Sequence, residues 1–116
     1  MLKNLLGQSA EKRAERFLTS HGLTLVARNW HCRFGEIDLI MQDGPTTVFV
    51  EVRLRNRSDF GGAAASVTPV KQKKLLAAAR QYLATLRTLP PCRFDVVALT
   101  GEAPPDWIKN AFDDIG

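Results

Sequence analysis

The chain has 116 residues, of which 45% are hydrophobic and 24% are charged, a balance typical of a soluble globular protein. Its length suits one compact domain, so we expect residues 1–116 to form a single domain. The composition excludes a disordered tail, a collagen-like repeat and a disulfide-stapled miniprotein, and the net charge of +4 is compatible with an anionic partner.

The first half of the chain predicts a helix followed by strands. Residues 8–21 carry apolar side chains at the three- and four-residue spacing of a helix, which Ser9 would cap and Gly22 would end. Residues 24–30 alternate weakly and are rich in strand-forming side chains, so they predict a first strand.

Two clearer strands, Gly35–Gln42 and Thr46–Arg55, are separated by Asp43-Gly44-Pro45. This is turn chemistry between two segments of period 2, and it predicts a β-hairpin.

The second half predicts a helix between two breaks. Thr68-Pro69 would cap and open a long helix that runs to about Arg87. Residues 93–100 predict another strand, and a short helical segment is expected around Trp107–Phe112. Because a long helix connects the last strand to the hairpin, that strand is expected to lie parallel to its neighbour. The order helix, three strands, helix, strand, helix predicts an α/β domain with helices packed on a mixed sheet.

Neither membrane insertion nor export is expected. No apolar stretch approaches the ~20 residues that cross a bilayer, and the N-terminus turns polar too early for a signal peptide. Cys32 and Cys92 form no Cys-x-x-Cys pair, so the expected location is the reducing cytoplasm. With His21 and His31 they match no zinc-site spacing.

The hairpin register separates two kinds of side chain. With a four-residue loop, Ile37, Leu39 and Met41 share one face with the valines of the next strand, and this face is expected to be core. On the other face Asp38 lies directly opposite Glu51.

Opposed carboxylates repel each other, so the pair requires a shared proton, a nearby cation or a bound metal. With water and a phosphate oxygen, Asp38 and Glu51 would make a Mg²⁺ site. A structural alternative remains open, because Glu36 lies opposite Arg53 in the same register and the four side chains could form a ladder of ion pairs.

The same residues carry a family resemblance. The three segments are Gly35-Glu36-Ile37-Asp38-Leu39-Ile40, Phe49-Val50-Glu51-Val52-Arg53-Leu54-Arg55 and Cys92-Arg93-Phe94-Asp95-Val96-Val97. With them the chain resembles, from about Gly7 to Phe112, the YraN family of small bacterial proteins. That family is similar to the archaeal Holliday junction resolvases and to the wider restriction-endonuclease-like superfamily, whose motif is PD-(D/E)xK.

The resemblance implies a restriction-endonuclease-like fold with a helix–three strands–helix–strand core. It also implies a nuclease that needs Mg²⁺ or Mn²⁺ and hydrolyses phosphodiester bonds of DNA, including branched DNA. By position Asp38 and Glu51 match the metal ligands, and Glu11 matches an accessory acid. A homodimer is a further expectation, since the related resolvases act as dimers on two-fold junctions.

One departure concerns the third motif residue, normally a lysine, which here is Arg53. An arginine neutralises a phosphate and stabilises a transition state, but it does not give up a proton near neutral pH. Whether the protein is an enzyme is therefore open. The alternative is a DNA- or RNA-binding module that kept the fold and lost turnover, and a third is an adaptor whose basic face binds an acidic protein.

Basic residues concentrate after the motif. Between Arg53 and Arg87 there are eight basic residues and one acidic residue, a pattern that indicates either a solvated face or a polyanion surface. Lys71 matches a family lysine at the start of the long helix, while Arg55 and Arg57 are candidates for clamping the nucleic-acid backbone.

Two further candidates have a structural alternative. Phe60, in an expected loop over residues 56–66, could stack on a base or simply lie on a surface loop. Asp95 could join the acidic residues, but pairing with Arg93 is the favoured interpretation.

Overall fold

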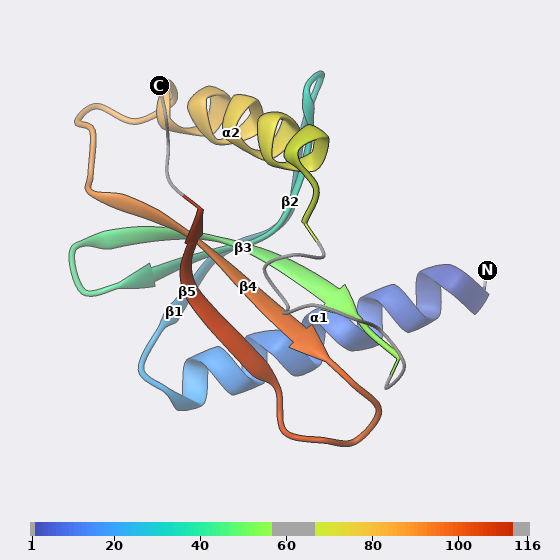
Figure 1. The fold of residues 1–116 in the computed structure, drawn as a ribbon. Coiled ribbons are helices and arrows are strands. Elements are labelled where there is room, and N and C mark those ends of the chain that lie inside the picture. The colour runs from blue at the N-terminus through green and yellow to red at the C-terminus, as the bar shows by residue number, and fades with distance from the viewer. Residues whose placement is uncertain (1, 57–66, 113–116) are drawn as a thin grey trace.

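The computed structural model describes residues 2–56 and 67–112, which form two helices and a five-stranded sheet (Figure 1). The elements are α1 (Leu2–Ser20), β1 (Thr24–Cys32), β2 (Gly35–Asp43), β3 (Thr46–Leu54), α2 (Pro69–Leu83), β4 (Cys92–Leu99) and β5 (Asp106–Phe112). In this part of the chain no helix is long and apolar enough to span a bilayer.

The sheet is mixed, with the strand order β1-β2-β3-β4-β5. Only β3 and β4 are parallel, and α2 is the crossover between them, as the sequence predicts. The expected hairpin register is confirmed at Ile40↔Phe49 and Gln42↔Thr47. The predicted opening of α2 is also confirmed, because Thr68 Oγ1 accepts the Lys71 N–H at 3.2 Å.

The helices lie on opposite sides of the sheet (Figure 1). Under α1 the core contains Ala10, Ala14, Leu18, Leu39, Met41, Val48, Val50, Val97 and Leu99. Under α2 a second cluster contains Ile37, Ile40, Phe49, Leu76, Ala78, Ala79 and Phe94. Both faces of the β2–β3 hairpin are therefore buried.

The predicted C-terminal helix around Trp107–Phe112 is wrong, because these residues form the edge strand β5. Val97↔Trp107 and Val96↔Ile108 pair it with β4. The strand satisfies backbone groups of β4 that would otherwise be an unpaired edge, a long-range benefit invisible to local periodicity.

The helix limits differ from the predicted ones as well. The first helix begins at Leu2, so Ser9 lies inside it and does not cap it, although Gly22 ends it as predicted, with φ of 95°. The second helix ends at Leu83 and not at Arg87. After it, Thr85 and Leu86 donate to the carbonyls three residues earlier, as in a 3₁₀ turn, and not four residues earlier as in an α-helix.

Strict alternation fails in β2. Leu39 belongs to the cluster under α1, whereas Ile37 belongs with Ile40 to the cluster under α2, so the prediction that Ile37 and Leu39 share a face is wrong. The neighbouring strand is irregular at the same level. Asn29, across from Asp38 on the rung between Arg28↔Leu39 and Trp30↔Ile37, has φ of 48°, in the left-handed region.

Candidate functional site

Strands β2 and β3 pair from the hairpin turn only as far as Leu39↔Val50. Beyond that point β2 turns away from β3 (Figure 1), and a cavity of about 330 Å³ opens between them. We call this cavity the acidic notch, and it is lined by Ala10, Glu11, Glu36, Asp38, Glu51, Val52, Arg53, Leu54 and Lys71. Four elements, α1, β2, β3 and α2, thus contribute to one site.

Asp38 is fixed at the point where the pairing stops. Its Oδ2 accepts a hydrogen bond from the Val52 backbone N–H at 2.9 Å, so the side chain provides the acceptor that the interrupted strand pair lacks. Burial raises the pKa of Asp38, and the Val52 N–H partly opposes this by favouring the charged form.

Glu51 is the most deeply buried acid of the notch, with 5% of the residue exposed. Its Oε1 lies 3.7 Å from Lys71 Nζ and 4.0 Å from Arg53 Nη1, while its Oε2 is buried with no hydrogen-bond partner. Burial, together with the charge of Asp38, raises the pKa of Glu51 to about 7, although Lys71 and Arg53 act in the opposite direction.

Glu11 reaches the notch from α1. Partial burial and the nearby charge of Asp38 raise the pKa of Glu11. The structure therefore brings together the three acids that the sequence singled out, along with Arg53 and Lys71.

The structural alternative, in which Glu36 pairs with Arg53, is not what the structure shows. The β2–β3 register ends before these residues, and Glu36 Oε2 lies 2.7 Å from His31 Nε2 on the other side, along β1. A ladder of ion pairs between β2 and β3 therefore does not neutralise Asp38 and Glu51.

Of the two predicted backbone clamps, the structure describes only Arg55. Arg55, half-buried just after β3, is not among the residues that line the notch, and its N–H donates to Leu99 O at 2.9 Å. Arg57 and Phe60 lie outside the described residues.

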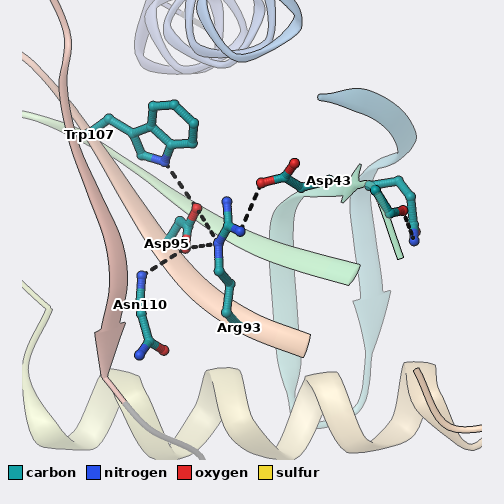
Figure 2. A network of polar contacts seen from close by, with 7 residues as sticks. Asp43, Arg93, Asp95, Trp107 and Asn110 are labelled. Atoms are coloured by element: carbon teal, nitrogen blue, oxygen red, sulfur yellow. Dashed lines mark hydrogen bonds and ion pairs between the residues drawn. The ribbon is translucent and has the colours of Figure 1, made fainter. Parts of the chain in front are cut away.

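A second buried carboxylate provides a comparison within the same molecule (Figure 2). Asp95, 1% exposed, accepts hydrogen bonds from Arg93 Nε, Trp107 Nε1 and the Asn110 N–H, each at 3.0 Å. Arg93 also contacts Asp43 at 2.8 Å. The favoured structural role of Asp95 is confirmed, since both of its oxygens are used within the fold, whereas Glu51 keeps one buried oxygen unused.

The donor set fits Mg²⁺ or Mn²⁺ with few protein ligands. Within residues 2–56 and 67–112 no group of three or more His, Cys, Asp or Glu side chains is arranged to hold a metal ion by itself. Two carboxylates suffice for Mg²⁺, which retains several waters and is often bound through one or two carboxylates together with substrate phosphates. The unused Glu51 Oε2 is the observation that favours such a ligand.

Sequence reasoning missed Asn29, which lines a cavity of about 310 Å³ that shares Glu11 with the notch. An asparagine inside a predicted strand was the available signal, because asparagine is depleted in strands and tolerates the left-handed region.

Comparison with known proteins gives a consistent family. The model of the uncharacterised protein family UPF0102 matches residues 10–99, a range that includes every residue lining the notch. A UPF0102 protein of Nitrosospira multiformis is 57% identical over 115 residues, which cover 97% of each chain. Similar proteins come from Nitrosomonas eutropha, 57% identical over 108 residues and 93% of each chain, and from Cupriavidus necator, 58% identical over 111 residues, 94% of this chain and 83% of the relative.

Proposed function

The chain belongs to the UPF0102 family, the YraN family, and we propose that it is a metal-dependent nuclease that hydrolyses DNA phosphodiester bonds at the acidic notch. The observation that carries this proposal is the unpartnered Oε2 of Glu51, buried beside a second carboxylate. A buried acceptor without a donor costs free energy, and a cation shared with Asp38 would remove that cost.

The fold supports the proposal at the level of architecture. A helix, a three-stranded meander, a crossover helix and a parallel strand follow in this order. This is the core that a restriction-endonuclease-like domain would have, with β5 as an addition. We propose that likeness, and with it the similarity to junction resolvases, on the basis of the order of elements and the motif residues.

In the proposed reaction Asp38 and Glu51 would hold a Mg²⁺ ion. Such an ion supplies Lewis acidity, which neutralises charge on the phosphate and makes water a better nucleophile at neutral pH. Lys71 Nζ and the Arg53 guanidinium lie 3.7 and 4.0 Å from Glu51, so both are placed to neutralise a phosphate that enters the notch. The carboxylate of Glu11, on the α1 side, orients a water molecule. The raised pKa of Glu11 also makes this carboxylate a better proton acceptor.

A second candidate function rests on Arg53. At the position of the motif lysine it remains charged near neutral pH, so it can bind a phosphate but cannot act as a base. A DNA- or RNA-binding module without turnover is the corresponding alternative.

A cleavage and binding assay distinguishes the two functions. End-labelled linear and four-way-junction DNA would be incubated with the protein and Mg²⁺, using wild type, Asp38→Asn and the exposed-turn control Glu102→Gln. The nuclease predicts cleavage by wild type and by the control, and binding without cleavage by Asp38→Asn. Binding with no cleavage of any substrate by wild type would support the module instead.

A further inference from the structure

Asn29 has an unusual backbone for a residue inside a strand. Within the described residues only two non-glycine residues have positive φ, Asn29 at 48° and Asn110 at 52°. A left-handed residue in a strand turns the peptide planes on either side of it and interrupts the alternation of side chains. Such a conformation persists only where the surrounding structure requires it, and it is concentrated at functional sites.

The interruption spans the rung that carries Asp38. Ala27 and Trp30, on either side of Asn29, both pack against the cluster under α2, although they are three residues apart. On the neighbouring strand Ile37 and Ile40, also three apart, lie in the same cluster. Strict alternation separates residues with odd spacing, so the change in pleat occurs on both strands.

The side chain of Asn29 is placed toward Glu11. It is half-buried and lines, with Glu11, the cavity of about 310 Å³ that adjoins the notch. Its amide lowers the pKa of Glu11, opposing the effects of burial and of Asp38. Asn110 offers a contrast, because its side chain is exposed and the fold uses its backbone N–H, which donates to Asp95 Oδ1.

We propose that Asn29 is the positioning residue of the acidic notch: its left-handed backbone aims Asp38 into the notch, and its side chain holds Glu11 beside it. This inference rests on the proposed metal site, and it assigns two separable roles to one residue. Glycine would satisfy the backbone alone, since it adopts positive φ without a steric penalty. The side-chain amide of Asn29 is not needed to adopt the left-handed backbone, so its loss tests the second role by itself.

The side-chain role is tested with Asn29→Gly, which keeps positive φ accessible, against Asn110→Gly as a matched control. Calorimetric titration with Mn²⁺ should show affinity about tenfold lower for Asn29→Gly than for wild type, the size of effect expected from loss of a residue that orients metal ligands. The control should bind Mn²⁺ as wild type does. Equal affinity in Asn29→Gly and the control would overturn the side-chain role.

The backbone role has a readout that needs no metal. In Asn29→Ala positive φ is disfavoured, so Asp38 should rotate and release the Val52 N–H that it holds at 2.9 Å. Hydrogen exchange of the Val52 amide should then accelerate by about tenfold relative to the amides of β4, while Asn29→Gly should remain close to wild type. Unchanged protection of Val52 in Asn29→Ala would overturn the backbone role. This readout decides the point even if wild type binds no Mn²⁺, a result that would refute the proposed metal site separately.

Discussion

The backbone N–H of Val52 donates a hydrogen bond to Asp38 Oδ2 over 2.9 Å, across two strands that have already stopped pairing. The side chain of one strand thus replaces the carbonyl that a continued ladder would offer to the other. The bond holds a carboxylate beside the buried Glu51. The hydrogen bond that compensates for the separation of β2 and β3 is therefore the same one that positions Asp38 in the notch.

Stability should depend on pH through Glu51. Its pKa is raised from 4.5 to about 7, so between these values the folded protein binds a proton that the unfolded chain has released. This contribution to stability is complete below about pH 4.5 and is lost as pH rises through about 7. Urea denaturation should show wild type losing about 1–3 kcal/mol more than Glu51→Gln between about pH 5 and about pH 8.

Glu102→Gln, on the exposed turn between β4 and β5, provides the control for loss of one acid. It should follow wild type across the pH range. If Glu51→Gln showed the same dependence as wild type and the control, Glu51 would not carry a raised pKa in the folded protein.

Arg53 should be required for its charge. The guanidinium lies 4.0 Å from Glu51 Oε1, and its Nε is buried without a partner, so a phosphate in the notch would be its natural acceptor. Single-turnover cleavage should fall at least about 100-fold in Arg53→Met, a loss comparable to that of one transition-state donor. Arg53→Lys should retain cleavage within about tenfold of wild type, because lysine keeps the charge but loses the fork geometry. Equal rates for wild type and Arg53→Met would remove Arg53 from the reaction.

The Asp95 network should support the fold without supporting the site. Removing one partner of a buried charge pair costs about 3–5 kcal/mol, so Asp95→Ala should lower the free energy of unfolding by this amount. Denaturation by urea measures the loss, and Mn²⁺ affinity of the folded variant should equal that of wild type. A variant that stayed folded but bound Mn²⁺ more weakly would connect the two carboxylate clusters.

The site was largely predictable because it depends on local register. Asp43-Gly44-Pro45 fixes the hairpin, and the pairing Ile40↔Phe49 predicts that Asp38 and Glu51 are neighbours. Both line the notch, although the ladder itself ends one rung earlier, at Leu39↔Val50. The helix cap at Thr68 similarly fixes where α2 begins, and it therefore places Lys71 in the first turn of that helix. These inferences need only period and turn chemistry.

The remaining features depend on long-range contacts or on a single backbone angle. Trp107 lies in a strand because β4 offers an unpaired edge, a fact that no local pattern contains. Ile37 leaves the face of Leu39 on the rung next to Asn29, whose positive φ no pattern of apolar residues predicts. The alternative ion pair between Glu36 and Arg53 requires a register that extends beyond the point where the strands separate.

The most direct test of the metal site is calorimetric titration of Mn²⁺, as a substitute for Mg²⁺, into wild type and Glu51→Gln at the same pH. Glutamine retains the shape of the side chain but removes its charge. The metal-site hypothesis predicts saturable binding to wild type that is lost in Glu51→Gln and retained in Glu102→Gln. Equal binding to wild type and Glu51→Gln, or none to wild type, would contradict it.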